Sequence, residues 1–357
     1  MEKIVFFNKS KYSLRLFKKQ IKNFAVSIFP NFLVKKIMEY NYTDMGSEIS
    51  NACNANCTFC AYRYQIRKKN VINYNLYKKS IDEYSDDGGG KVSFTPVVGD
   101  PLVDKNLLEK VKYARSKKNI NGVFLYTNAL FFDRYKISEV INSGLTRIAI
   151  STFFGDKELY KKYYGVDGYE RVVKNIIDLA KENNLQKKPI YITLHLRVEA
   201  PESRWVDNKE FKEIVSLVGS ENVSFKTEYE NWSGMITDKD LPAGCKLGEN
   251  LSVKDKSKEP CWELYRKVYI MSDGRVGVCP TRDLEGEIEI GNSNDNKLIE
   301  IWRGSKIKKF KKNWVEGKLP KVCIECDRYR PISSYIKENK YEILKVQIKN
   351  RIFKSLN

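Results

Sequence analysis

Three cysteines stand close together in the segment Cys53-Asn-Ala-Asn-Cys57-Thr-Phe-Cys60. Three thiolates on one tight loop can hold three irons of a cubane [4Fe–4S] cluster and leave the fourth iron without a protein ligand, open to a small molecule. Zinc is the alternative, but a structural zinc ion takes four ligands. The next cysteine is Cys245 and the single histidine is His195, both far along the chain. The spacing therefore favours an iron–sulfur cluster.

A second set of cysteines lies toward the C-terminus. Cys261 and Cys279 flank an alternating stretch that turns at Asp273-Gly274, a strong hairpin signal, and Cys323-Ile-Glu-Cys326 follows later. A hairpin with two cysteines and a C-x2-C knuckle predicts a four-thiolate site, which alone fits a zinc ribbon as well as a cluster. Cys245 is left over, and we interpret it as an ordinary cysteine rather than an alternative ligand or a catalytic thiol.

Composition describes a globular chain of 357 residues with 42% hydrophobic and 12% aromatic residues. No run of about 18 apolar residues and no signal-peptide pattern is present. Clustered cysteines without an export signal favour a reducing cytoplasm. The net charge of +19 would suit nucleic acid, anionic lipid or phosphorylated substrates. However, the joint excess of Lys, Asn, Ile and Tyr is also what AT-rich codons produce, so the charge is weak evidence.

Short apolar strands alternate with helical patterns from about residue 44 to residue 230. Six such β–α repeats predict a parallel sheet with helical crossovers, and the active site of such a fold lies where the strands end. The expected strands are 47–51, 92–95, 122–127, 146–151, 190–198 and 223–227, and the expected helices are 74–84, 106–117, 135–142, 169–182 and 208–218.

The cysteine spacing, with Phe59 before the last cysteine, resembles the radical S-adenosylmethionine (radical SAM) superfamily. The resemblance implies an α/β fold with a partial (β/α)6 TIM-like barrel. It also implies that SAM chelates the open iron, that Phe59 packs near the adenine, and that a donor such as flavodoxin or ferredoxin reduces the cluster. SAM would then be cleaved to methionine and a 5′-deoxyadenosyl radical, which abstracts a substrate hydrogen.

Two segments at the ends of successive strands match this superfamily. Val98-Gly99-Asp100-Pro101-Leu102 is similar to its Gly-Gly-Glu-Pro-Leu segment, whose backbone and acid take the SAM amino group. Here the first Gly is Val98 and the acid is the shorter Asp100, which leaves a shorter reach or a backbone-only contact open. Thr127-Asn128-Ala129 resembles its Thr-Asn-Gly. The resemblance therefore implies that Gly99, Asp100 and Asn128 bind the cofactor.

Later strands supply further candidates. Ser151 closes strand four, where relatives place a ribose-binding group, and the Arg that relatives often carry before a Gly is Tyr164 here. Arg197 on strand five is then the candidate partner of the SAM carboxylate, because an arginine fork pairs well with a carboxylate. His195 shares a strand face with Arg197 and is a candidate catalytic proton donor or acceptor. A hydrogen-bonded structural histidine is the alternative.

The second cysteine set, written C-x12-G-x4-C and then C-x2-C, resembles the shortened, single-cluster form of the SPASM auxiliary domain, called a twitch domain. The resemblance implies one auxiliary [4Fe–4S] cluster held by Cys261, Cys279, Cys323 and Cys326, hence two clusters in the chain. A fully ligated cluster has no vacancy for substrate, so electron transfer is its expected role. Asn231-Trp232-Ser233-Gly234 resembles a segment that precedes such domains.

The predicted organisation has five parts. These are a basic amphipathic N-terminal segment (1–43), the barrel (44–236), a polar linker (237–260), the small cluster-binding domain with its hairpin (261–335) and a basic amphipathic helix (336–357). The two basic ends leave peripheral membrane contact open beside ordinary packing.

We therefore expect an oxidoreductase-type radical SAM enzyme acting on a small sugar-, cyclitol- or nucleotide-like substrate, free or lipid-linked, by oxidation, elimination or epimerisation. Maturation of a peptide or protein side chain is the first alternative. We expect no leader-recognition domain, since about 45 residues before strand one are few for a domain with its own core. A zinc-bound nucleic-acid-binding protein is the second alternative, and it accounts for neither the open three-cysteine loop nor the six repeats.

Overall fold

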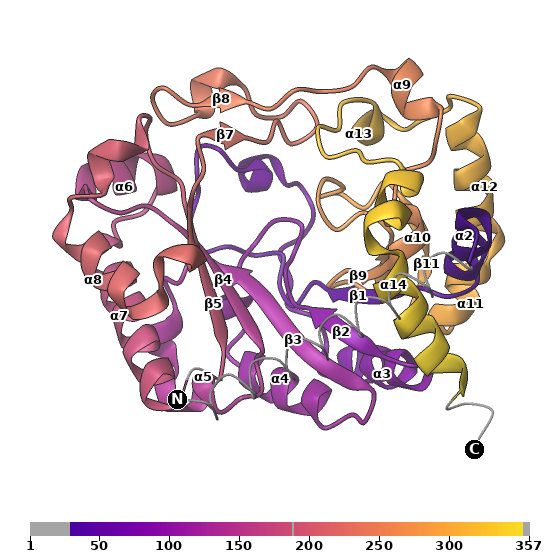
Figure 1. Ribbon diagram of the computed structural model, residues 1–357, viewed down its shortest axis with the longest axis horizontal. Coiled ribbons are helices and arrows are strands. Elements are labelled where there is room, and N and C mark those ends of the chain that lie inside the picture. The colour runs from indigo at the N-terminus through magenta and orange to yellow at the C-terminus, as the bar shows by residue number, and fades with distance from the viewer. Residues whose placement is uncertain (1–28, 188, 353–357) are drawn as a thin grey trace, which may run out of the picture.

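The computed structural model describes residues 29–187 and 189–352, and a sheet with a largely parallel centre organises them (Figure 1). The strand order is β11-β10-β9-β1-β2-β3-β4-β5-β6. Its parallel strands are β1 (Asp44–Ser47), β2 (Gly90–Ser93), β3 (Ile120–Thr127), β4 (Arg147–Thr152), β5 (Tyr191–Leu196) and β6 (Val223–Phe225). The predicted partial barrel of the α/β class, followed by a small C-terminal domain, is confirmed.

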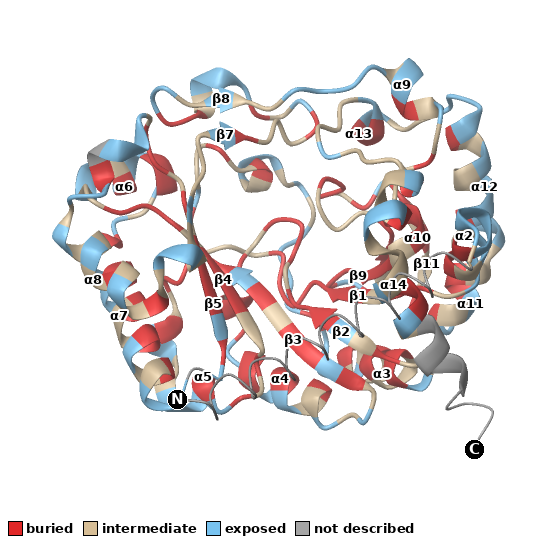
Figure 2. Ribbon diagram, in the orientation of Figure 1, coloured by how far each residue is buried: buried red, intermediate tan, exposed pale blue. Residues whose placement is uncertain are grey.

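Helices cover the outer face of these strands. They are α3 (Tyr74–Asp86), α4 (Leu107–Arg115), α5 (Ile137–Ile141), α6 (Lys157–Tyr164), α7 (Tyr169–Leu185) and α8 (Lys209–Val218). Apolar residues recur at helical spacing along α7, where Val172, Ile176 and Leu179 are buried. Figure 2 shows buried residues on the inward faces of the helices and exposed residues on their outward faces. The apolar periodicity thus fixes which side of each helix meets the sheet.

The predicted hairpin is present, and it continues the barrel sheet. Strand β9 (Lys267–Ile270) pairs in parallel with β1, and β10 (Arg275–Gly277) returns antiparallel to it and pairs with β11 (Glu289–Asn292). Gly274 makes the turn with a φ of 93°, in the region that favours glycine. The remaining helices of this part are α10 (Glu263–Arg266), α11 (Leu298–Arg303), α12 (Ser305–Val315) and α13 (Lys321–Ile324). The sheet that leads into the first cysteine loop therefore also carries the hairpin between Cys261 and Cys279.

The stretch expected to be a linker does more than connect. Strands β7 (Glu228–Tyr229) and β8 (Lys246–Leu247) pair with each other, and α9 (Val253–Ser257) follows; together they arch over the top of the view in Figure 1. Lys256 on α9 is fully buried and donates to the carbonyl oxygens of Cys323, Ile324 and Cys326 at 3.3, 2.8 and 2.7 Å. A buried lysine thus anchors the predicted linker to the second cysteine pair.

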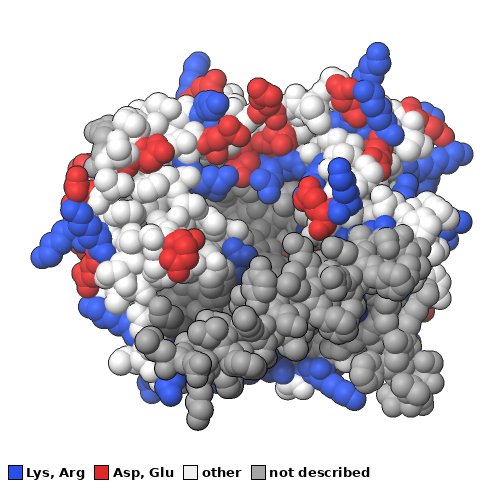
Figure 3. Space-filling model, viewed as in Figure 1, with Lys and Arg blue, Asp and Glu red and all other residues white. Residues whose placement is uncertain are grey.

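Residues 1–28 of the predicted amphipathic N-terminal segment lie outside the described residues. The C-terminal helix α14 (Ile332–Ile352) packs against α2 (Asn31–Tyr40), and its Ile343 and Leu344 are buried. Within residues 29–352, no helix is long and apolar enough to cross a membrane. Basic and acidic side chains are interspersed along the upper rim of the face seen in Figure 3. Packing therefore accounts for at least part of the apolar face of α14.

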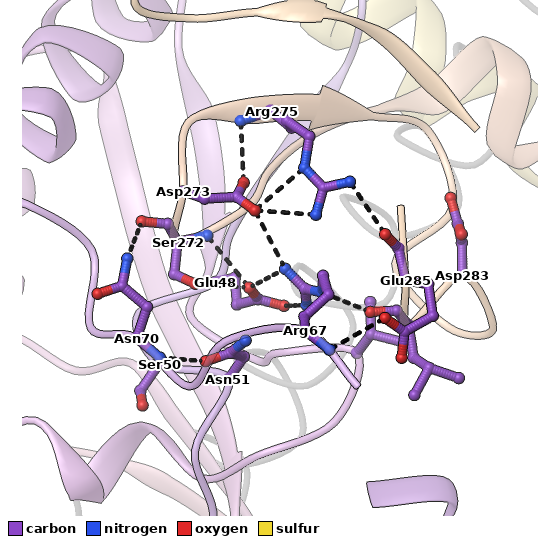
Figure 4. Close-up of polar contacts among 12 residues, drawn as sticks. Glu48, Ser50, Asn51, Arg67, Asn70, Ser272, Asp273, Arg275, Asp283 and Glu285 are labelled. Carbon is purple, nitrogen blue, oxygen red and sulfur yellow. Dashed lines mark hydrogen bonds and ion pairs between the residues drawn. The ribbon is translucent and has the colours of Figure 1, made fainter. Parts of the chain in front are cut away.

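A buried ion pair fastens the segment after the first cysteines to the hairpin (Figure 4). The Arg67 guanidinium donates two hydrogen bonds to Glu48, at 3.0 and 2.8 Å, just beyond β1. Glu48 also accepts from the backbone N–H and hydroxyl of Ser272 at the hairpin turn, at 3.1 and 2.9 Å. Because the two side chains are only 7% and 0% exposed, this pair fixes where the chain returns from the cysteine loop.

Replacing Arg67→Met should therefore lower the free energy of unfolding by about 3–5 kcal/mol, because it leaves the buried Glu48 carboxylate unpaired. Chemical denaturation measures the change. Arg275→Met is the matched control, since Arg275 binds Asp273, which is 40% exposed, and should cost about 1 kcal/mol or less. Equal effects of the two substitutions would contradict the assignment.

Candidate active site

The first cysteine loop follows β1 and lies at the carboxyl ends of the parallel strands. Its backbone is bound by the end of α6: Asn56 N–H donates to the Tyr164 carbonyl at 3.0 Å, and Thr58 N–H to the Tyr163 carbonyl at 2.9 Å. Gly165 ends α6 with a φ of 64°, and a Cβ there would lie 2.7 Å from the Asn56 carbonyl oxygen. The sequence did not predict α6, whose last turn is thus a support of the loop.

The turn after β2 supports the loop from another side. Asp100 N–H donates to the Ala52 carbonyl at 2.9 Å. Gly99 has a φ of 120°, and a Cβ on it would lie 2.8 Å from the Ser50 carbonyl oxygen. Only glycine fits this contact, because an added side chain would be both strained and in collision with backbone.

Asp100 is 2% exposed, and its carboxylate binds other protein groups. It accepts hydrogen bonds from the Thr127 hydroxyl, at 2.8 Å from Oδ2, and from the backbone N–H groups of Asn128 and Leu102, at 2.8 and 2.9 Å. Burial raises the pKa of Asp100 to about 6, while these hydrogen bonds act in the opposite direction. The carboxylate thus joins the ends of β2 and β3, and the backbone of this turn remains the part that faces the site.

Asn128 lies next to the first cysteine. Its Nδ2 donates to Asn54 Oδ1 at 2.6 Å and lies 3.8 Å from Cys53 Sγ. Ala129, which stands where the resemblance expects glycine, has a φ of 67° and is fully buried. The Thr-Asn-Ala turn therefore keeps the left-handed backbone that glycine would favour, with Asn128 directed at the cysteine loop.

An aromatic and cationic group surrounds Phe59. The ring of Phe59 contacts Tyr164 and Tyr229 with centroids 5.4 and 5.3 Å apart, and the Arg197 guanidinium lies 5.5 Å from its centre. Burial opposes the positive charge of Arg197, but Glu230, at 3.5 Å, outweighs it and the pKa of Arg197 is raised. Arg197 Nε also donates to Ser151 Oγ at 3.4 Å. The structure thus brings Phe59, Ser151 and Arg197 together.

His195 lies one pleat away from this group. Its Nδ1 lies 2.9 Å from Ser224 Oγ, and its ring stacks on Tyr126 with centroids 5.6 Å apart. Burial lowers the pKa of His195, and the charges of Arg147 and Arg197 lower it further. The imidazole is therefore neutral at pH 7 and held in place, as a structural histidine would be.

Several polar atoms around the loop lack a partner in the part of the protein that the structure describes. Burial raises the pKa of all three thiols, and the charges of Cys60 and Cys53 raise that of Cys57 further, so the three sulfurs are neighbours. Several buried polar atoms nearby lack a hydrogen-bond partner among the described residues, namely Asn54 Nδ2, Thr58 Oγ1 and the hydroxyls of Tyr164 and Tyr229. Unpaired buried groups are costly, so this donor set fits a cluster with a polar ligand on it.

The four cysteines of the second set line a single cavity of about 460 Å³. In the described residues no three His, Cys, Asp or Glu side chains stand close enough to hold one metal ion. Four thiols that line one cavity are the donor set that the sequence predicts for a four-thiolate site. Arg328 N–H donates to Cys326 Sγ at 3.3 Å. Cys245 is not in this cavity; its thiol donates to the Val198 carbonyl at 3.2 Å.

The Asn-Trp-Ser-Gly segment fastens the barrel to the C-x2-C pair. Trp232, Ser233 and Gly234 all have positive φ values, of 50°, 54° and 82°, which makes a left-handed turn. Ser233 Oγ donates to the Val322 carbonyl at 2.8 Å, and Asn231 Nδ2 to the Glu325 carbonyl at 3.3 Å. The turn therefore holds the second cysteine pair at a fixed place beside β7.

Comparison with known proteins agrees with this geometry. The family model of the radical SAM superfamily matches residues 47–202, which include the first cysteine loop. The family model of the iron–sulfur cluster-binding SPASM domain matches residues 261–327, which include the second set of cysteines. The chain belongs to the radical SAM superfamily and carries a C-terminal SPASM domain.

Solved structures share the fold of this radical SAM enzyme at low identity. BtrN in complex with AdoMet and 2-DOIA is 16% identical with a TM-score of 0.53, over 82% of this chain and 95% of that one. Streptococcus suis SuiB bound to precursor peptide SuiA is 16% identical with a TM-score of 0.53, over 76% and 66% of the two chains. Native anSMEcpe with AdoMet is 14% identical with a TM-score of 0.50, over 87% and 100%.

Curated relatives match about two fifths of this chain. GTP 3′,8-cyclase of Chlorobaculum tepidum is 26% identical over 140 residues, 39% of this chain and 42% of that protein. Probable GTP 3′,8-cyclase of Thermococcus kodakarensis is 30% identical over 142 residues, 39% of this chain and 44% of that protein. The match thus spans about two fifths of the length of these relatives.

Gly99→Ala should displace the cysteine loop and prevent the first cluster from assembling, because the added Cβ meets the Ser50 carbonyl oxygen. Iron content after anaerobic reconstitution should fall from about eight to about four per chain. Gly317→Ala is the control: its φ is also positive, at 74°, but an added Cβ there meets no atom within 4 Å. Full iron content in Gly99→Ala would show that the contact is not needed.

Proposed function

We propose that this radical SAM enzyme abstracts hydrogen from a small sugar-, cyclitol- or nucleotide-like substrate and completes an oxidation, elimination or epimerisation. In this proposal Cys53, Cys57 and Cys60 hold the [4Fe–4S] cluster, and SAM occupies its open iron. The bound pair supplies a 5′-deoxyadenosyl radical. The chain binds and orients SAM and the substrate and shields the radical. A donor such as flavodoxin or ferredoxin provides the electron.

The positions of the candidate residues support specific roles in binding SAM. The backbone around Gly99 is proposed to take the amino group, because the Asp100 carboxylate already accepts three protein hydrogen bonds. Arg197 is proposed to take the carboxylate, since it lies over Phe59 and beside Ser151. Phe59 then packs near the adenine, and Ser151 and Asn128 supply the remaining polar contacts to SAM. His195 is proposed to contact substrate as a neutral hydrogen-bonding group.

A single auxiliary [4Fe–4S] cluster on Cys261, Cys279, Cys323 and Cys326 is the second part of the proposal. The observation that carries it is the shared cavity of these four cysteines, which leaves no iron of a cubane without a thiolate. A cluster with no vacancy serves electron transfer. It would accept one electron from a substrate radical during an oxidation or return one during a redox-neutral reaction.

Deuterium transfer tests the substrate class. Deuterated aminocyclitols, hexoses and nucleosides should be incubated with reconstituted enzyme, SAM and dithionite, and 5′-deoxyadenosine examined by mass spectrometry. Deuterium in 5′-deoxyadenosine from one of these classes is the expected result. Transfer from peptides alone would overturn the proposal in favour of peptide maturation. Cys53→Ala/Cys57→Ala/Cys60→Ala is the control and should release no 5′-deoxyadenosine.

The paired variant Cys323→Ala/Cys326→Ala tests the auxiliary role. It should retain about four irons per chain and still cleave SAM, because the first cluster is untouched, but it should lose product. Iron content, 5′-deoxyadenosine and product are measured on the same sample. Product at the parent rate would refute electron transfer through the second site.

A further inference from the structure

Arg282 is a buried cation that none of the roles above uses. It follows the β10 strand and Cys279, is 4% exposed, and lines the cavity shared by the four cysteines. Nε donates to Asp327 Oδ1 at 2.8 Å, and Nη1 donates to the Thr281 carbonyl at 2.7 Å. Nη2 is buried and has no hydrogen-bond partner among the described residues. Nε and Nη1 of the guanidinium are therefore held by protein acceptors, while Nη2 has none in the described part of the chain.

The flat face of this guanidinium stacks on Trp232, with 4.8 Å between its carbon and the ring centre. Trp232 also packs against the apolar group that includes Ala61 and Val98, with Cys60 beside it. Arg282 thus stacks on a tryptophan that packs against the same apolar group as Cys60 of the first cysteine set.

The unpaired donor points to an acceptor. Leaving a buried N–H of a charged group without an acceptor is unfavourable. Asp327 accepts from Arg282 Nε through Oδ1 and from the backbone N–H of Asn231 through Oδ2, at 2.5 Å, and makes no hydrogen bond to Nη2. The acceptors that the proposed function brings into this cavity are the sulfurs of an anionic cubane. Hydrogen bonds to sulfur and nearby positive charge both raise the reduction potential of such a cluster.

We propose that Arg282 is a positioning residue for the auxiliary cluster: its free Nη2 donates to a cluster sulfur, and its charge raises the reduction potential of that cluster. This inference rests on the proposed auxiliary site. Trp232 and Asp327 hold the guanidinium in the required orientation. The arrangement makes the auxiliary site a better electron acceptor than four thiolates alone would make it.

The test measures the potential of the auxiliary cluster by itself. In a full-length background of Cys53→Ala/Cys57→Ala/Cys60→Ala, only the second site can load iron, and a redox titration followed by electron paramagnetic resonance reports its midpoint potential. Arg282→Met should retain about four irons and shift the potential to more negative values. Arg275→Met, which removes a cation of the same hairpin outside the cavity, should leave the potential unchanged.

Arg282→Lys separates charge from hydrogen bonding and serves if Arg282→Met fails to fold. It keeps the positive charge but loses the planar guanidinium with its several N–H donors. The reduction potential should therefore shift to more negative values by less than in Arg282→Met. A potential equal to the parent in either iron-loaded variant overturns the proposal. A background protein that binds no iron at the second site instead refutes the auxiliary cluster itself, which distinguishes failure of the proposed function from failure of this inference.

Discussion

The backbone of the first cysteine loop is bound by its neighbours on every side that the structure describes, and the arrangement of the barrel follows from this. The last turn of α6 supplies two carbonyl acceptors, and the Gly99 turn supplies a donor and a close contact. The Glu48–Arg67 pair then ties the outgoing chain to the hairpin. Three thiolates can leave one iron without a protein ligand only if no other group of the loop moves in to bind that iron. The close backbone contacts restrain the loop from doing so.

The same sheet carries the hairpin between Cys261 and Cys279. Because β9 pairs with β1, the strand that precedes the first cysteines lies beside the strand that leads to Cys279. The left-handed Asn-Trp-Ser-Gly turn and buried Lys256 bind the C-x2-C pair from the barrel side and from the arch. These contacts fix the separation of the two sites within one packed unit. A fixed separation is what electron exchange between a substrate site and an auxiliary cluster requires.

Sequence reasoning succeeded where a pattern is repeated or chemically distinctive. The strands and α7 follow from apolar periodicity, the hairpin from Asp273-Gly274, and the family from the spacing of cysteines. It missed α6, whose last turn is rich in tyrosine rather than in the usual aliphatic residues. It also described 237–260 as a linker, because little in the local sequence marks Lys256 as the buried lysine among so many exposed ones. The one local hint that Lys256 is buried was its position in a short capped helix flanked by polar residues.

Other contacts had no local signature at all. Glu48 and Arg67 are both ordinary charged residues in sequence, and only the return of the chain to β1 brings them together. The same holds for Arg282 and Asp327, which are buried as a pair. Asp100 stands where the resemblance places a glutamate, and only the structure shows that its carboxylate accepts hydrogen bonds from Thr127 and two backbone N–H groups.

The most direct test of the account is the response of the first cluster to SAM. Protein that carries Cys323→Ala/Cys326→Ala, reconstituted anaerobically and reduced, should show the electron paramagnetic resonance signal of one [4Fe–4S]⁺ cluster. Addition of SAM should change its g-values, because the sulfonium compound becomes a ligand of the open iron. A signal that is absent, or that SAM leaves unchanged, would contradict the open-corner site on which the account depends.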